Sequence, residues 1–113
     1  MGIIPIENLV IGGQRIPPSH GQYFDNTNPA TGELIAKIAQ GGQDIDRAVE
    51  HALSAQKNWR NMQAEERAEL MRDLSRRIED NSSRLARYDT QDAGKPIKHT
   101  RKFDVPESAK RFF

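Results

Sequence analysis

The chain has 113 residues, 17 lysines and arginines against 16 aspartates and glutamates, and no cysteine. This length suits one small domain or part of one. A net charge of +1 gives no electrostatic field that would steer the chain to nucleic acid or an anionic membrane, so neither is expected as a partner. The lack of cysteine excludes disulfide scaffolds, thiolate zinc sites and a cysteine nucleophile. The sequence also has no secretory signal and no long apolar run, which predicts a soluble, cytoplasmic protein.

The first part of the chain, residues 1–42, is predicted to consist of short strands and turns. Leu9–Ile11 and Gln14–Ile16 are β-prone runs on either side of Gly12 and Gly13. A glycine pair between two such runs is typical of a β-hairpin, because glycine adopts positive φ at low cost.

A second chain reversal is predicted at Asn28–Gly32. Pro29 and Gly32 are typical turn residues, since proline presets φ and glycine tolerates the left-handed region. Extended structure is expected on both sides of this turn, over residues 23–24 and 33–39.

From residue 43 onward the apolar residues recur at helical spacing, and residues 43–113 are predicted to form three to four helices. Asp44 is expected to cap the first of them. Trp59, at the end of its apolar stripe, is expected in the core. The stripe consists of Ile45, Ala48, Val49, Ala52, Leu53 and Trp59.

Two further helices are predicted with clear boundaries. One covers Ala64–Asp80, and the next covers residues 83–93 and ends at Gly94, with Pro96 two residues later. Between these two residues, Lys95 lies favourably near the negative end of the helix dipole.

The last segment covers residues 97–113. Pro106 is expected either to start a helix there or to kink one. Phe112 and Phe113 close the segment, and burying their rings requires a partner surface that this chain does not supply.

No cluster in the sequence indicates catalysis. His20, His51 and His99 lack the spacing of a metal site or a catalytic dyad and are interpreted as surface residues. Gly41 and Gly42 precede a helix, but no Lys-Ser/Thr pair follows them, so they are interpreted as a simple turn and not a phosphate loop.

Six segments, taken in order, resemble the N-terminal region of the NAD(P)-dependent aldehyde dehydrogenase superfamily. They are the hairpin at residues 10–15, NPATGE at 28–33, DIDRAVEHA at 44–52, Trp59 with EERAELM at 65–71, DAGKPI at 92–97, and DVP at 104–106. The pattern looks most like the branch that acts on betaine aldehyde, aminoaldehydes and semialdehydes.

The resemblance implies an α/β family fold. Residues 1–113 would be an incomplete N-terminal portion of its Rossmann-like cofactor-binding domain, with short β-hairpins followed by three to four helices, an α+β arrangement in isolation. Its partners would be the rest of the aldehyde dehydrogenase fold or further copies in a homo-oligomer.

By the same resemblance, the cofactor loop and the catalytic cysteine, glutamate and asparagine of the family lie downstream of this region. The full-length enzyme would use NAD or NADP, whereas no nicotinamide cofactor and no activity are expected for this chain alone. The alternative is a non-catalytic helical module that binds a full-length homologue or another protein.

One functional feature of the family maps onto this region. Many members hold a sodium or potassium ion, and the resemblance assigns Asn26, Thr27 and Asp104 to an incomplete set of its ligands. Main-chain carbonyls and a carboxylate are hard oxygen donors that suit such ions. The alternative role for Asp104 is that of a helix cap or a solvent-exposed acid.

Overall fold

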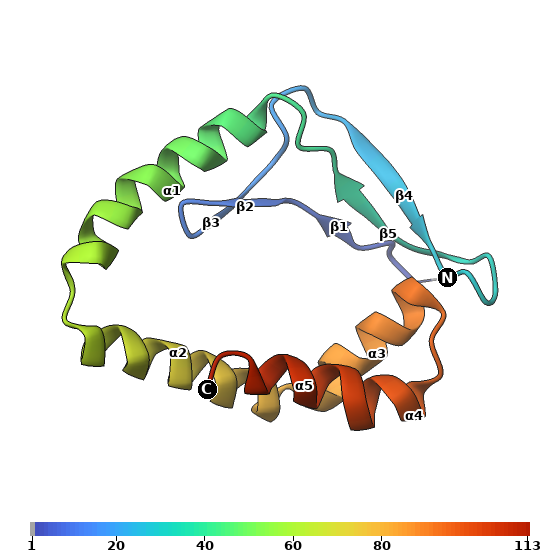
Figure 1. Ribbon diagram of the computed structural model, residues 1–113. Coiled ribbons are helices and arrows are strands. Elements are labelled where there is room, and N and C mark those ends of the chain that lie inside the picture. The colour runs from blue at the N-terminus through green and yellow to red at the C-terminus, as the bar shows by residue number, and fades with distance from the viewer. Residues whose placement is uncertain (1) are drawn as a thin grey trace. The chain divides into compact units, whose positions relative to one another are not determined.

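The computed structural model describes residues 2–113, which form two compact units (Figure 1). The first unit comprises Met1–Thr27 and Glu33–Asn61, of which residue 1 lies outside the described part, and the second comprises Asn28–Gly32 and Met62–Phe113. Each unit is described by itself.

The first unit contains a three-stranded sheet of β1 (Ile6–Glu7), β5 (Leu34–Ala39) and β4 (Tyr23–Thr27), in that order (Figure 1). β4 and β5 are antiparallel, which confirms the predicted reversal between them. β1 pairs with β5 in parallel, a pairing that was not predicted. Two alanines of β5, Ala36 and Ala39, are buried and form part of the core.

The same unit contains the predicted hairpin. β2 (Leu9–Ile11) and β3 (Gln14–Ile16) pair antiparallel, with Leu9 opposite Ile16. Gly12 and Gly13 connect them with φ of 60° and 77°, a left-handed backbone that requires glycine in a tight hairpin.

Helix α1 (Asp44–Asn61) completes the first unit and contacts β2. It begins at Asp44 as predicted, but the Asp44 carboxylate accepts hydrogen bonds from the backbone N–H and the hydroxyl of Ser19. The acid therefore holds the loop before β4 to the start of the helix.

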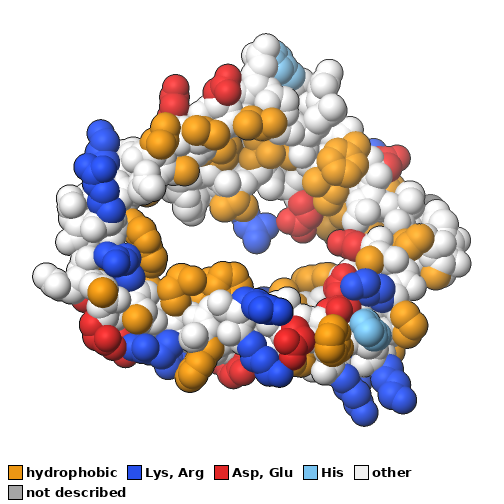
Figure 2. All heavy atoms as spheres, in the orientation of Figure 1, with side chains coloured by type: hydrophobic (Ala, Val, Ile, Leu, Met, Phe, Trp, Pro, Cys, Tyr) orange, Lys and Arg blue, Asp and Glu red, His pale blue; other side chains and the backbone are white. Residues whose placement is uncertain are grey.

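The apolar stripe of α1 is largely exposed, and Trp59 is 39% exposed, so the prediction that Trp59 lies in the core was wrong. Helical spacing predicts which side chains share a face, whereas burial requires a neighbouring element on that face. Val49 and Leu53 are also more than half exposed, and Figure 2 shows hydrophobic side chains at the surface along α1.

The second unit is helical. Its elements are α2 (Ala64–Asp80), α3 (Ser82–Ala93), α4 (Ile97–His99), the π-helical turn η1 (Thr100–Asp104) and α5 (Val105–Lys110). The predicted bounds of α2 are confirmed, and those of α3 differ by one residue at its start.

Small residues allow the helices of this unit to pack closely. α2 contacts α5, and the buried hydroxyl of Ser75 on α2 donates to the carbonyl of Ala109 on α5 at 2.8 Å. α3 contacts η1 and α5, where Ala86 is fully buried. Thr100 is also fully buried, and its hydroxyl lies 2.8 Å from that of Thr90 on α3.

Pro106 lies in the first turn of α5, directly after the π-helical turn. There the N–H of Val105 donates to the carbonyl of Thr100, five residues earlier. Proline lacks an N–H and clashes with the carbonyl four residues before it, so the wider turn accommodates Pro106 within a continuous helical segment. The segment ends near Phe113, whose side chain is exposed.

Within the part of the chain that the structure describes, no helix combines the length and the apolar character that crossing a membrane requires.

Candidate functional site

Lys95 lies in the turn between α3 and α4. Gly94 ends α3 with a φ of 73°, and its N–H donates to the carbonyl of Thr90 at 2.9 Å. A Cβ at Gly94 would lie 3.0 Å from Cγ of Pro29, so the turn at Asn28–Gly32 packs directly against this glycine. Pro96 precedes α4 with its φ fixed by the ring. The backbone is therefore constrained on both sides of Lys95.

The Asp104 carboxylate interacts with two basic side chains. Its Oδ2 accepts a hydrogen bond from Nζ of Lys95 at 2.9 Å, and its Oδ1 lies 3.6 Å from Nε2 of His99. The Asp104 side chain is 22% exposed and that of Lys95 is 47% exposed, so the acid is the more buried partner. The hydrogen bond with Asp104, its charge and the more weakly acting charge of Asp89 raise the pKa of Lys95 above its ordinary value.

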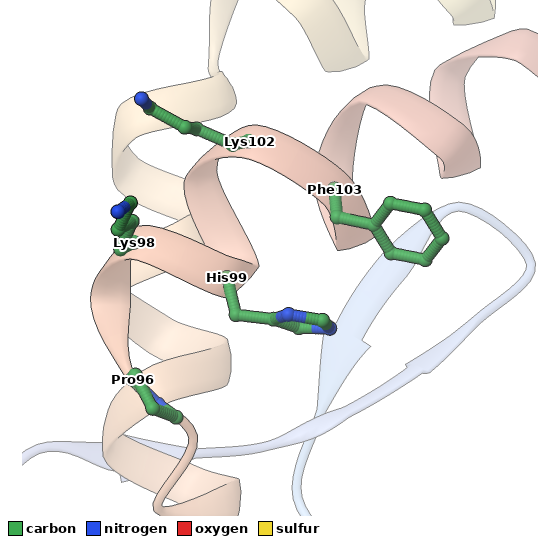
Figure 3. A pocket seen from close by; sticks show the side chains of 5 residues that line it. All are labelled: Pro96, Lys98, His99, Lys102 and Phe103. Carbon is green, nitrogen blue, oxygen red and sulfur yellow. The ribbon is translucent and has the colours of Figure 1, made fainter.

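A shallow groove of about 320 Å³ lies beside this ion pair, lined by Pro96, Lys98, His99, Lys102 and Phe103 (Figure 3). The rings of His99 and Phe103 are 5.4 Å apart and extend to one side of the helical segment, while the two lysines extend to the other. The groove presents positive charge and aromatic surface, which can bind an anion, but its lining includes no serine, threonine or carboxylate to act as a nucleophile.

A second groove of about 360 Å³ contains the carboxylate itself. Its lining combines an apolar floor with two acids and a hydroxyl: Ile78, Leu85, Val105, Asp89, Asp104 and Ser108. The Ser108 hydroxyl donates to the main-chain carbonyl of Asp104 at 2.8 Å, so it is already engaged. This groove is suited to binding a positive charge and not to covalent chemistry.

The residues predicted to hold a cation fall in both units. Asn26 and Thr27 end β4 in the first unit, with a β-bulge between them, and Asp104 belongs to the second unit. Carbonyl and carboxylate oxygens are suitable donors for a monovalent ion, and the Asp104 carboxylate does bind a singly charged group, the Lys95 ammonium. Among residues 2–113, no three His, Asp or Glu side chains converge to hold a metal ion.

The other two histidines, His20 and His51, belong to the first unit and line neither groove. Nε2 of His20 is 3.0 Å from Oε1 of Gln43. The ring of His51 lies so close to the hairpin turn that a Cβ at Gly12 would approach its Nδ1 to 2.8 Å. All three histidines are exposed, which confirms their interpretation as surface residues.

Sequence reasoning missed the ion pair between Lys95 and Asp104. Nine residues separate the two, with a glycine–proline turn and a π-helical turn between them. Neither helical nor strand periodicity places residues at that separation side by side. The motifs DAGKPI and DVP, and the place of Lys95 at the end of a helix, pointed to these residues singly and not as a pair.

Residues 16–113 match the model of the aldehyde dehydrogenase family. An acetaldehyde dehydrogenase of Pseudomonas aeruginosa is 38% identical over 103 residues, and aldehyde dehydrogenase B of Escherichia coli (strain K12) is 36% identical over the same length. Each match covers 90% of this chain and 20% of the relative. The chain thus spans about a fifth of the length of the curated relatives it matches.

Solved structures show the same likeness. PnpE in complex with nicotinamide adenine dinucleotide and a putative aldehyde dehydrogenase from Burkholderia cenocepacia each superpose with a TM-score of 0.90 and 36% identity, over 94% of this chain and 22% of theirs. The predicted α/β fold, with short strands followed by helices, is confirmed by this likeness. Because the family model matches most of its length, the chain belongs to the aldehyde dehydrogenase family.

Proposed function

We propose that this chain is the non-catalytic N-terminal portion of an NAD(P)-dependent aldehyde dehydrogenase that oxidises an aldehyde to a carboxylic acid. The observation that carries the proposal is the family match over residues 16–113, supported by the TM-score of 0.90 to a relative solved with nicotinamide adenine dinucleotide. The bound nicotinamide would accept a hydride in the full-length enzyme.

The contribution of these residues to such an enzyme is structural. The chain contains no cysteine, so it supplies no thiolate to attack an aldehyde. The two grooves described above contain no acid–base pair with an adjacent nucleophile. Its hairpin, sheet and helices instead form a folded support, with the constrained turn at Gly94 and Pro96 presenting Lys95 to Asp104.

The test is an NAD- and NADP-dependent aldehyde oxidation assay on the purified chain, read by the absorbance of the reduced cofactor. We expect no turnover above a blank without protein. Turnover by the chain alone would refute its assignment as non-catalytic.

A second experiment tests the parent enzyme. Sequencing the gene beyond the codon for Phe113 should show an open frame that encodes a cofactor loop and a cysteine motif. A frame that continues without them would contradict the dehydrogenase role.

The narrower assignments belong to the same proposal. We infer a substrate of the betaine aldehyde, aminoaldehyde or semialdehyde class, a soluble cytoplasmic enzyme and a homo-oligomer. Acetaldehyde is the comparison substrate, because one relative is an acetaldehyde dehydrogenase. The full-length enzyme should have a higher kcat/KM for betaine aldehyde, an aminoaldehyde or a semialdehyde than for acetaldehyde, and a preference for acetaldehyde over all three would exclude this branch.

A monovalent cation is part of the proposal as well. Its ligands in this chain would be the carbonyls of Asn26 and Thr27 and the carboxylate of Asp104, with the remaining ligand from the downstream part of the enzyme. Oxygen donors of this kind favour sodium or potassium over softer metals.

The exposed apolar face of α1 favours one other function, that of a module that binds a homologue or another protein. Sedimentation and thermal melting of the chain distinguish the two. A monomer that unfolds cooperatively supports the module, whereas aggregation or partial disorder supports a portion that requires the rest of its fold.

A further inference from the structure

Three large apolar side chains of α1 form an exposed line along one side of the helix. Ile45, Val49 and Leu53 are 62%, 51% and 58% exposed, and they follow one another at intervals of four residues. Side chains four residues apart lie one above the other on a helix, so the three make a continuous apolar surface, which we call the α1 contact face. Figure 2 shows hydrophobic side chains along this helix. An exposed apolar face of this kind is typical of a protein-contact surface.

The β2–β3 hairpin lies on another side of α1. The ring of His51 is so close to the hairpin turn that a Cβ added at Gly12 would lie 2.8 Å from its Nδ1. His51 precedes Leu53 by two residues, a separation that places two side chains on different sides of a helix. The hairpin therefore leaves the α1 contact face open within the first unit.

Two charged side chains of opposite sign lie beside the α1 contact face. Asp46 precedes Leu53 by seven residues, about two turns, and Lys57 follows Leu53 by four residues, about one turn. Both therefore lie on the same side of the helix as Leu53. Both are exposed, and neither forms an ion pair among residues 2–113. The acid lies toward the start of the helix and the base toward its end, and each is available to a partner.

The order of these charges decides how a second copy of the chain can bind. In an antiparallel pair related by a two-fold axis, the acidic end of each α1 faces the basic end of the other, and the charged flank of one copy faces the same flank of the other. In a parallel pair, the two Asp46 side chains lie at one end and the two Lys57 side chains at the other, so like charges come together. The α1 contact face is therefore complementary to itself in the antiparallel orientation.

We propose that two copies of the chain associate antiparallel through the α1 contact face. A two-fold axis midway between Val49 and Leu53 places Val49 of each copy against Leu53 of the other. Asp46 lies five residues before this midpoint and Lys57 six residues after it, so the same axis brings the two to nearly the same height across the interface. Burial of the apolar side chains drives the association, and the two ion pairs between Asp46 and Lys57 select its orientation.

This inference deepens the second candidate function, because it names a second copy of the chain as the partner of α1. The helix has 18 residues and is about 27 Å long, so the contact is smaller than the roughly 800 Å² per partner of a standard interface. We expect a dissociation constant on the order of 100 µM. At about 5 µM the chain is a monomer, so thermal melts at this concentration report folding and not association.

The test reverses the two charges, singly and together, in the 113-residue chain, and measures the dissociation constant of the dimer by sedimentation equilibrium. Asp46→Lys and Lys57→Asp should each raise it about tenfold, because each turns two attractive contacts of the dimer into two repulsive ones. The double variant, Asp46→Lys with Lys57→Asp, should return to within about threefold of the wild type, since opposite charges face each other again.

The matched control is Glu50→Lys, which changes the net charge as Asp46→Lys does and also replaces an exposed acid of α1. The proposed axis places Glu50 opposite Ala52 of the other copy, so the dissociation constant should change less than about threefold. A wild-type chain that is still a monomer at about 500 µM overturns the proposal, and so does a double variant that associates as weakly as the single ones.

Cross-linking tests the orientation without a charge reversal, so it decides the question even if a reversed charge unfolds the chain. The chain has no cysteine, so Ala52→Cys and Arg60→Cys each supply a single thiol. In the antiparallel dimer, the two copies of position 52 are offset by roughly 3 Å along the helix axis and those of position 60 by roughly 27 Å. A short bifunctional maleimide should therefore link Ala52→Cys and not Arg60→Cys, and equal linkage of the two would overturn the proposal. The readout is association and not turnover, so failure here is distinguishable from failure of the dehydrogenase assignment.

Discussion

At the scale of single residues, Asp44 shows how packing changes the role of a side chain. An aspartate at the start of a helix predicts a cap, and α1 does begin there. In the structure, its buried carboxylate accepts two hydrogen bonds from Ser19, twenty-five residues earlier. These bonds lower the pKa of Asp44 below its ordinary value, with the side-chain bond as the larger cause and the backbone bond next.

The lowered pKa predicts a specific pH dependence. A carboxyl group with a depressed pKa in the folded state stabilises the fold above its unfolded pKa of about 3.9, and this contribution is lost as the pH falls through the lower folded value. Asp44→Asn should therefore reduce the melting temperature at pH 7, with the difference from the wild type shrinking as the pH falls below about 4. Thermal melts across this pH range measure it.

The control for this prediction is Asp46→Asn, which removes an exposed acid from the same helical turn. It should change the melting temperature less than Asp44→Asn does. If the difference in melting temperature between the wild type and Asp44→Asn stays constant from pH 7 to below about pH 4, the role assigned to the Ser19 hydrogen bonds is contradicted.

At the scale of elements, the end of α3 depends on one glycine. Gly94 adopts a φ of 73° and lies against Pro29, whose Cγ would be 3.0 Å from an added Cβ. Gly32 has nearly the same φ, 75°, but a Cβ there would meet nothing within 4 Å. The two glycines lie in the same unit and differ in contact, not in backbone conformation.

Alanine substitution at these two positions should separate strain from contact. Gly32→Ala should lower the free energy of unfolding by about 1 kcal/mol, the usual cost of a left-handed residue with a Cβ. Gly94→Ala should cost about 1 kcal/mol more, because the Pro29 ring must also move. Urea denaturation followed by circular dichroism measures both values.

Removing the Pro29 ring provides the internal check. In a Pro29→Ala background, the cost of Gly94→Ala should fall toward that of Gly32→Ala. Equal costs for the two glycine substitutions in the wild-type background would show that the contact contributes nothing.

At the scale of the whole molecule, each unit buries a few small apolar residues and leaves larger ones exposed. In the helical unit, Ala86, Val105 and Ala109 are buried and Ser75 bonds across two helices. In the first unit, Val49 and Leu53 of α1 are more than half exposed. A face of this kind along one helix is typical of a protein-contact surface.

Polar substitution of this face should leave the fold intact. Val49→Gln with Leu53→Gln should change the free energy of unfolding by less than about 0.5 kcal/mol, because exposed residues contribute little packing. The same variant should bind less of a dye that fluoresces on apolar surface and should self-associate less in sedimentation experiments.

Glu50→Gln with Ser54→Gln is the matched control, since both residues are exposed on the same helix. It should leave dye binding and sedimentation unchanged. A loss of about 2 kcal/mol or more in the double apolar variant would instead indicate that the face is packed within this chain.

The sequence by itself determined most of the elements, their order and the family. Alternating and helical periodicities, together with the glycine and proline turns, are local signals, and they placed the hairpin, the β4–β5 reversal and the helices within a few residues. The motifs spread over nearly the whole chain identified the family that the comparisons show.

Only the tertiary structure decided which of these elements meet. Four features depend on which residues, distant or differently spaced in sequence, come together. They are the parallel pairing of β1 with β5, the hydrogen bonds from Ser19 to Asp44, the exposure of Trp59 and the pairing of Lys95 with Asp104. Periodicity describes one element at a time, whereas burial and ion pairing depend on what a second element places against it.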